Sequence, residues 1–345
     1  AKAEKQALLM ARHLKDKEGK LPRSLNSNGE LVTSSSDWWC SGFFPGVLWY
    51  LYENNKGSEE LFDYANLYTK RIEKEQFNTS THDLGFMLYC SYGNGFRLNP
   101  TSESEGVLIN GAHALSARYN PVVKCIRSWN KWRDYSYPVI IDNMMNLEML
   151  MWAYKRTGDD TFKNIAISHA NTTKLHHFRE DYSSFHVVAY DLKSGKVLQR
   201  GTDQGYGDDS SWARGQAWAL YGYTMMYRET GNEDYLNLAW HIADFILNHS
   251  HLPKDKIPYW DFDSPGIPDD YRDSSSAAII ASALLELSKY SEGHRCERYY
   301  TVAEQQLRML ASDEYMAEVG TNGFFKTWSR KYSSEFRIGC SFELW

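Results

Sequence analysis

The sequence RTGDDTFKNIA at residues 156–166 recurs as NKGSEELFDYA at 55–65 and as ETGNEDYLNLA at 229–239. In each copy, a Gly precedes an Ala by eight residues and is followed at once by Ser, Asp or Asn. Gly often ends a helix in the left-handed conformation, and Ser, Asp and Asn often cap the start of the next helix. Each copy therefore predicts a tight turn between two helices, and a looser copy is expected around Gly293.

The helix before each turn is expected to be apolar. Such runs occupy residues 47–52, 147–154, 219–227 and 277–285. Their apolar side chains cover more than one face, which is typical of an inner helix with neighbours on both sides. The spacing between Gly57 and Gly158 leaves room for one further unit, which is expected to begin at Asp83 and to turn near residues 92–95.

Six helical hairpins of this size would fill the 345 residues. They predict an all-α fold of the (α/α)6 barrel class, a ring of six hairpins that forms one domain over residues 1–345. A closed ring is favoured because an open array needs polar caps at its ends. In such a ring the inner helices start at one end, so Asp83 and Asp142 are expected to meet there. A short β-hairpin is expected within residues 187–198 and an irregular loop at 257–268.

The composition limits the classes of partner. A hydrophobic fraction of 42% is ample for a core, and a formal net charge of −6 without a basic run argues against nonspecific nucleic-acid binding. The sequence has no run of about 18 apolar residues, so no membrane-spanning helix is expected. The 12 Trp and 24 Tyr residues supply flat faces that suit stacking on sugars, although helical cores also use aromatic residues.

The five cysteines, Cys40, Cys90, Cys125, Cys296 and Cys340, have no metal-ligand spacing. Their odd number and wide gaps predict free, mostly buried thiols. The chain begins at Ala1 instead of Met, which suggests that a signal peptide has been removed. A bacterial-type periplasm and a cytoplasm are therefore both open as locations, and the oligomeric state is not indicated.

Two aspartates each stand where an apolar, helix-patterned run begins: Asp83 in THDLGF and Asp142 in VIIDNMM. A helix start exposes unpaired N–H groups and a positive dipole end, so either residue alone can be a structural cap. Two acids beside Trp side chains also indicate glycoside chemistry. Glycosidases place two carboxyls about 5–5.5 Å apart for retention or about 6.5–9.5 Å apart for inversion. The residues alone do not fix the separation.

Longer motifs carry a resemblance to a known family. The run GTDQGY at residues 201–206, followed by SWARGQAW at 211–218, resembles the signature of unsaturated glucuronyl hydrolases, glycoside hydrolase family 88. The motifs THDLGF at 81–86, IDN at 141–143 and DSSSA at 273–277 resemble the same family. The resemblance extends from about Asp37 to Ala303, and the family fold is a six-hairpin (α/α) ring, which agrees with the repeats.

The resemblance implies a reaction. Family enzymes act on lyase-generated oligosaccharides that carry a 4,5-unsaturated uronic acid at the non-reducing end, and they hydrate its C4=C5 bond without a cofactor or metal. Asp142 matches the family acid/base, which would protonate C4 and help water add at C5. Asp83 matches the second family aspartate. Burial and a like-charged neighbour would keep the Asp142 carboxyl protonated near neutral pH.

Further site residues follow from the same resemblance. His186 and Gln204 match residues near the reacting centre. Positions that match substrate contacts are His82, Asn143, Arg214, Trp218 and Ser275, with Trp39 and Trp129 as stacking walls. Arg214 suits an anionic sugar because its planar fork matches carboxylates and sulfates. Structural roles stay open for two of these residues: His186 can be a buried core histidine, and Arg214 can pair with Asp208 or Asp209. His176 and His177 are expected at the surface.

The resemblance favours glycosaminoglycan fragments of the chondroitin, heparin or hyaluronan type as substrates. One alternative is an unsaturated rhamnogalacturonyl hydrolase that acts on pectin fragments. A second is a non-catalytic sugar-binding ring, and a sugar epimerase fits poorly because only His82 and His186 are candidate paired histidines. Residues 327–345 depart from the family because they lack its glycine-containing loop and its final acidic-aromatic helix. This departure predicts weaker binding of the sugar beyond the cleaved bond.

Overall fold

A computed structural model describes residues 2–26, 28–55, 57–320 and 323. The contacts of the chain divide it into two compact units. Unit 1 comprises Ala1–Asn78, Asp83–Ala114 and Leu310–Trp345, and unit 2 comprises Thr79–His82 and Leu115–Met309. One domain over residues 1–345 stays a prediction, and the atypical segment 327–345 lies outside the described residues.

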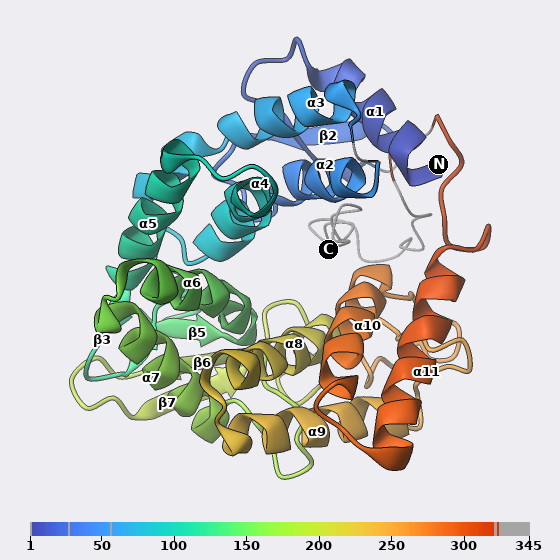
Figure 1. Cartoon of the computed structure of the whole chain (residues 1–345). Coiled ribbons are helices and arrows are strands. Elements are labelled where there is room, and N and C mark those ends of the chain that lie inside the picture. The colour runs from blue at the N-terminus through green and yellow to red at the C-terminus, as the bar shows by residue number, and fades with distance from the viewer. Residues whose placement is uncertain (1, 27, 56, 321–322, 324–345) are drawn as a thin grey trace. The chain divides into compact units, whose positions relative to one another are not determined.

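Unit 1 is built mainly from helices. Its elements are α1 (Lys2–Leu14), the antiparallel strands β1 (Leu21–Leu25) and β2 (Leu31–Ser34), α2 (Phe43–Asn54), α3 (Glu59–Lys70), the 3-10 helix η1 (Glu73–Phe77), the π-helix η2 (Gly85–Gly93), α4 (Asn94–Leu98) and most of α5 (Ser102–Ser116). Helix α2 packs against α3 (Figure 1), and it also contacts η2. The chain reverses between α2 and α3, where Ser58 accepts a hydrogen bond from the Leu61 N–H.

Unit 2 combines helical hairpins with a small sheet. Its elements are β3 (Tyr119–Asn120), β4 (Cys125–Ile126), β5 (Pro138–Ile140), the 3-10 helix η3 (Ile141–Asn146), α6 (Leu147–Thr157), α7 (Asp160–His176), β6 (Val187–Tyr190), β7 (Val197–Gly201), α8 (Ala213–Thr230), α9 (Glu233–Asn248), α10 (Ser274–Ser288) and α11 (Gly293–Leu310). Strands β5, β6 and β7 form an antiparallel sheet in that order. Helix α8 packs against both α9 and α10 (Figure 1).

The repeated turns form as the sequence predicts. The four turn glycines have positive φ angles: Gly57 (98°), Gly158 (74°), Gly231 (68°) and Gly293 (55°). Beyond two of them, Asp159 and Asn232 cap the next helix by accepting from the N–H of the second residue after the cap. These glycines occupy a conformation that costs other residues steric strain, so the repeat in the sequence is a repeat of backbone geometry.

The second hairpin turns later than predicted. The chain stays helical from Gly85 to Leu98, and α5 starts at Ser102, so the prediction of a turn at residues 92–95 is wrong. Gly95 serves close packing instead of a turn. A Cβ atom there would lie 3.1 Å from the Trp49 ring, so glycine lets α4 approach α2.

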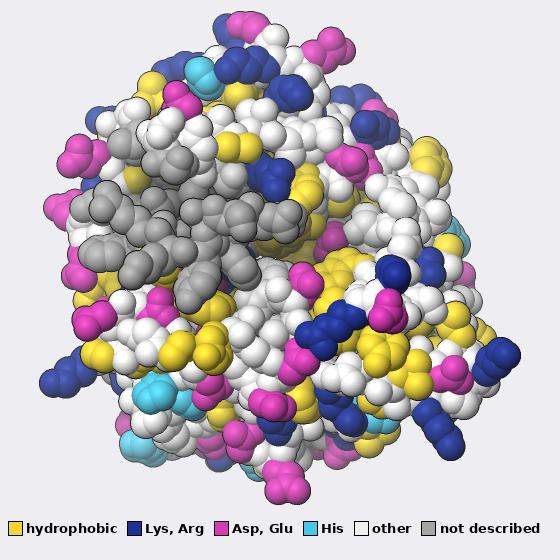
Figure 2. Space-filling model, turned by 180° about the vertical axis from the view of Figure 1, so that it is seen from behind, with side chains coloured by type: hydrophobic (Ala, Val, Ile, Leu, Met, Phe, Trp, Pro, Cys, Tyr) yellow, Lys and Arg dark blue, Asp and Glu magenta, His cyan; other side chains and the backbone are white. Residues whose placement is uncertain are grey.

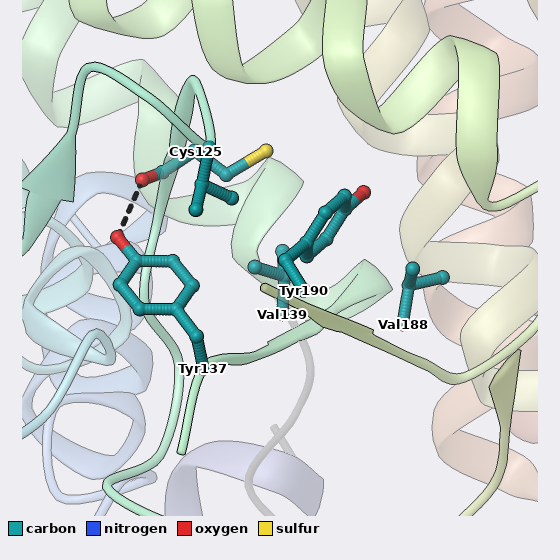
Figure 3. Close-up of a cluster of buried hydrophobic side chains, with 6 residues drawn as sticks. Cys125, Tyr137, Val139, Val188 and Tyr190 are labelled. Atoms are coloured by element: carbon teal, nitrogen blue, oxygen red, sulfur yellow. Dashed lines mark hydrogen bonds between the residues drawn. The ribbon is translucent and has the colours of Figure 1, made fainter. Parts of the chain in front are cut away.

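A buried cluster supports the strands that flank the site. Val139 of β5 and Val188 and Tyr190 of β6 pack with Cys125 and Tyr137 (Figure 3). The hydroxyl of Tyr137 donates to the carbonyl oxygen of Cys125 at 2.8 Å. The cluster therefore fixes β5 and β6 on one face, and a second buried cluster covers their other face.

The surface carries both signs of charge. Lys and Arg side chains are interspersed with Asp and Glu side chains over the face in Figure 2. Within the part of the chain that the structure describes, no helix is long and apolar enough to cross a membrane. Cys90, Cys125 and Cys296 are free, as predicted, whereas Cys40 is disulfide-bonded and the prediction of a free thiol there is wrong.

Candidate active site

Asp142 and His186 are brought together by β5 and β6. Strand β5 leads directly into η3, which carries Asp142 in its first turn, and His186 comes directly before β6. The Ile141 N–H donates to the His186 carbonyl at 3.0 Å and so continues the pairing of the two strands. The Asp142 Oδ2 atom then lies 3.5 Å from the His186 Nε2 atom. Both side chains are buried, so the pair is largely shielded from water.

The hydrogen bonds of His186 determine which ring nitrogen carries its proton. Its Nδ1 atom accepts from the backbone N–H groups of Asp203 at 3.1 Å and Gln204 at 3.3 Å. A nitrogen that accepts N–H donors cannot itself be protonated, so the proton of the neutral ring is on Nε2, toward Asp142. Burial lowers the pKa of His186 to about 3. The ring is therefore a neutral hydrogen-bond donor at neutral pH.

Two indole rings hold the imidazole in place. The centroid of the His186 ring is 4.6 Å from that of Trp212 and 5.8 Å from that of Trp129, which meets it edge-on at 82°. The Trp129 side chain is half-buried, as a wall of a site would be. Trp212 lies inside the motif SWARGQAW, but nothing in that motif distinguishes it as a neighbour of His186.

Arg214 lies in the first turn of α8, and its Nε donates to Asp273 Oδ2 at 3.2 Å. Asp273 also caps α10, because its Oδ1 accepts from the Ser276 N–H at 2.9 Å. Neither Asp208 nor Asp209 is the partner that the structure shows for Arg214; Asp208 binds Arg133 at 2.7 and 2.8 Å. The ion pair thus joins the starts of α8 and α10 and keeps a guanidinium 5.2 Å from the Trp212 ring.

Four other predicted site residues are buried in unit 2. Asn143 donates to the Ile126 carbonyl at 3.3 Å and accepts from Asn146 at 3.2 Å, so it holds η3 in place. His82 is close enough to His186 for its charge to lower the His186 pKa, after the larger effect of burial. Trp218 lies on α8, and Ser275 lies in the first turn of α10. Their contacts with substrate stay predictions.

Two predicted site residues belong to unit 1. The Asp83 carbonyl accepts from the Met87 N–H at 2.9 Å, just where η2 begins. The half-buried Trp39 ring packs edge-on against Phe43, with the ring centroids 5.7 Å apart, and against Phe86, at 5.6 Å. Both residues stay predictions as parts of the site.

His177 corrects an expectation of surface exposure. It is fully buried, and its Nε2 lies 3.1 Å from the carbonyl oxygen of Val139 on β5. The backbone carbonyl of His177 also accepts a hydrogen bond from the Phe185 N–H at 2.7 Å. His177 therefore connects the end of α7 to β5, which leads into the helix of Asp142, and to Phe185, which precedes His186. His176, by contrast, is partly exposed.

The arrangement suits proton transfer to an apolar carbon centre beside an anionic group. A buried carboxyl faces a fixed N–H donor, and a guanidinium lies on the neighbouring helix start. Such groups can deliver a proton, orient a ligand and neutralise its carboxylate. Within the described part of the chain, no three His, Cys, Asp or Glu side chains are grouped as metal ligands would be.

The chain has relatives among known proteins. No protein-family model matches it. An unsaturated glucuronyl hydrolase from Formosa agariphila is 47% identical over 308 residues, which cover 88% of this chain and 76% of the relative. An unsaturated glucuronyl hydrolase from Bacillus sp. is 31% identical over 316 residues, 90% of this chain and 83% of the relative.

Solved structures agree. The crystal structure of an unsaturated glucuronyl hydrolase specific for heparin is similar with a TM-score of 0.92 and 44% identity, over 99% of this chain and 92% of that one. This similarity confirms the predicted fold class, the all-α (α/α)6 barrel. With such identity over most of its length, this chain belongs to the unsaturated glucuronyl hydrolases and is a glycosidase of that family.

Proposed function

We propose that this enzyme removes the 4,5-unsaturated uronic acid from the non-reducing end of glycosaminoglycan fragments by hydrating the C4=C5 bond. The observation that carries the proposal is the buried carboxyl of Asp142, 3.5 Å from a His186 nitrogen that bears a proton. Direct displacement at the anomeric carbon would need a second carboxyl at a defined distance from the first. Hydration needs one carboxyl that first gives and then takes a proton.

The proton moves in two steps. The protonated Asp142 carboxyl gives its proton to C4, and the ring oxygen stabilises the positive charge that develops at C5. Water then adds at C5 and returns a proton to the Asp142 carboxylate, which restores the acid. The product is a hemiketal at C5, which opens to a ketone and leaves a hemiacetal at C1. Collapse of this hemiacetal breaks the glycosidic bond and releases the partner sugar.

His186 contributes a hydrogen bond and does not exchange protons. Its Nδ1 is occupied by two backbone donors, and burial holds its pKa near 3, so it stays neutral through the cycle. The Nε2–H can orient the Asp142 carboxyl or the incoming water. This separates the two roles: the carboxyl carries the proton, and the imidazole fixes its direction.

Arg214 is the proposed partner of the uronate carboxylate. Its side chain is 12% exposed, and its Nε is already bound to Asp273, which fixes the direction of the guanidinium. A buried, fixed guanidinium binds a carboxylate more strongly than a mobile surface lysine would. The heparin specificity of one similar solved enzyme makes an unsaturated heparin disaccharide the first substrate to test.

The test follows the absorbance of the conjugated C=C–carboxylate group. Wild-type enzyme and Asp142→Asn are each mixed with unsaturated heparin, chondroitin and hyaluronan disaccharides. We expect loss of absorbance with wild type on at least one disaccharide, and none with Asp142→Asn. Retention of absorbance on all three, with loss on an unsaturated pectin disaccharide, would contradict the proposed substrate class.

A further inference from the structure

The two amides that fix His186 belong to a loop whose backbone donors all have partners. Thr202, Asp203, Gln204, Gly205, Tyr206 and Gly207 form this segment, which we call the amide loop. The Gly205 N–H donates to Thr202 Oγ1 at 2.7 Å, and the Gly207 N–H donates to Ser210 Oγ at 3.0 Å. The Thr202 N–H donates to Asp208 Oδ1 at 3.1 Å. The direction of the two amides that face His186 therefore depends on the acceptors around the loop.

One of these acceptors, Asp261, comes from a distant segment of the chain. Its Oδ2 accepts from the Tyr206 N–H at 2.9 Å and from Ser210 Oγ at 2.7 Å, and its Oδ1 accepts from the Asp263 N–H at 2.9 Å. Asp261 is 0% exposed. Burial raises the pKa of this carboxyl, whereas the hydrogen bonds from Tyr206 and Ser210 favour its charged form.

The Asp261 carboxylate is itself held firmly. The Ala213 N–H donates to the Trp260 carbonyl at 3.0 Å, and the Phe262 N–H donates to the Ser211 carbonyl at 3.1 Å. These bonds pair the segment around Asp261 with the start of α8. The fit to the amide loop is also tight, since a Cβ atom on Gly205 would lie 3.0 Å from Asp261 Oδ2.

We propose that Asp261 is a positioning residue that sets the tautomer of His186 through the amide loop. Loss of the carboxylate would leave the Tyr206 N–H and the Ser210 hydroxyl without their buried acceptor, and the loop would shift to satisfy them. The N–H groups of Asp203 and Gln204 would then leave Nδ1, which could take up the ring proton. The tautomer with its proton on Nε2, facing Asp142, would then no longer be the only one populated. The catalytic part of this inference rests on the proposed function; the tautomer does not.

The test reads the tautomer directly by nitrogen magnetic resonance of ¹⁵N-histidine-labelled protein. The His186 signals are identified by their loss in His186→Gln. In wild type we expect an unprotonated Nδ1 and a protonated Nε2. In Asp261→Ala we expect averaged nitrogen shifts, and kcat at least about tenfold lower with KM changed by less than about twofold. The matched control is Asp263→Asn, because Asp263 is exposed and its carboxylate accepts the N–H of Ser211, which lies outside the amide loop.

Each outcome decides the matter. Unchanged His186 shifts in a folded Asp261→Ala protein would overturn the proposal, and so would altered shifts with unchanged kcat. If Asp261→Ala does not fold, the isosteric Asp261→Asn is measured instead. Both carboxylate oxygens of Asp261 accept hydrogen bonds, whereas an asparagine amide has only one accepting oxygen, so partly averaged His186 shifts are expected in Asp261→Asn. Wild-type His186 shifts in this variant would equally overturn the proposal. The wild-type tautomer can be read even if the enzyme hydrolyses none of the disaccharides, which keeps this test distinct from that of the proposed function.

Discussion

The chemistry of the site depends on which atoms of His186 and Asp142 can carry a proton. His186 is the poorer proton carrier, because two backbone donors occupy its Nδ1 and burial lowers its pKa to about 3. We therefore propose that the Asp142 carboxyl, 3.5 Å from the other ring nitrogen, is the group that gives and takes protons. The division of roles follows from hydrogen-bond geometry and from burial together.

Asp142→Asn is the most direct residue-scale prediction. The amide has nearly the same shape but cannot donate a proton to C4 or accept one from water. We expect kcat to fall by about 10²–10⁴-fold, the usual contribution of general acid–base catalysis. Steady-state kinetics checks the fall, and the far-ultraviolet circular dichroism spectrum should match wild type. Activity within threefold of wild type would show that another group transfers the proton.

Arg214→Lys separates charge from geometry. Lysine keeps the positive charge but loses the planar fork that matches a carboxylate. We expect KM for an unsaturated disaccharide to rise about tenfold, equivalent to about 1.4 kcal/mol of binding, with a smaller change in kcat. The control is Arg295→Lys, whose surface ion pair with Asp244 is 4.0 Å long. Equal KM values for Arg214→Lys and the control would rule out a carboxylate-binding role.

At the residue scale, the sequence allowed prediction of proximity where a motif was local, and the catalytic roles of these residues stay predictions. Asp142, His186 and Gln204 were selected from short motifs, and the structure brings their atoms together. The partner of Arg214 was not predictable, because Asp273 is distant in sequence and competes with the nearer Asp208 and Asp209. Asp261 was also missed, since its role depends on hydrogen bonds between an irregular loop and a second loop.

At the scale of elements, the contact between α8 and η3 positions Asp142. Gly222 of α8 lies against Met144 of η3, and a Cβ atom at residue 222 would overlap the Cβ of Met144. Glycine is therefore required for this close approach, even though glycine in a helix interior costs roughly 0.5–1 kcal/mol relative to alanine. The helix gives up intrinsic stability so that η3 can sit close to it.

Gly222→Ala should therefore destabilise the protein by about 1–3 kcal/mol, the usual effect of overpacking, and lower kcat by displacing η3. The matched control is Gly106→Ala in α5, where an added Cβ meets no atom within 4 Å. That control should gain stability, because alanine is the better helix former. Urea unfolding measures both, and a stabilised Gly222→Ala would contradict the packing account.

Two buried histidines, His169 in α7 and His177 directly after its end, predict acid sensitivity. Burial lowers the pKa values of His169 and His177 to about 3 from 6.5. The unfolded chain therefore binds more protons than the folded chain between about pH 6.5 and 3, so stability is lost as the pH falls through this window. Each histidine should cost about 1 kcal/mol of unfolding free energy between pH 7 and 5.5.

Urea unfolding at pH 7 and 5.5 checks this sign and size. On acidification, His169→Leu should lose less free energy of unfolding than wild type does, and the difference should equal the contribution of one buried histidine. His13→Leu is the control, since His13 is exposed and the variant should keep the wild-type loss. An identical loss in His169→Leu and His13→Leu would show that the buried histidine does not contribute.

Element-scale prediction worked for the repeats and failed for one turn. The glycines at positions 57, 158 and 231 required positive φ, and that requirement is visible in the sequence as a regular Gly–Ala spacing. In the sequence, Gly93 and Gly95 resemble turn glycines. In the structure, Gly93 allows close packing against Tyr89, and Gly95 allows close packing against Trp49. A glycine chosen for tight contact cannot be told from a turn glycine without the neighbouring helix.

At the scale of the whole molecule, the predicted fold class and the family are both confirmed by relatives that cover most of the chain. Stacked hairpins give such a fold a strong sequence signal, because each one repeats the same helix, turn and cap. The repeat does not encode the proposed site, whose residues lie in the loops and helix starts between the repeated turns. The substrate class therefore has to be tested on the intact enzyme.

The most direct test of the central claim is the position of solvent oxygen in the product. An unsaturated heparin disaccharide is cleaved in H₂¹⁸O, and the released uronic acid is analysed by mass spectrometry at early times. Hydration started by Asp142 predicts that ¹⁸O enters at C5, at the same rate as the loss of the C=C absorbance. Direct attack at the anomeric carbon would instead place ¹⁸O at C1 and release a sugar that still absorbs, and that result would contradict the account.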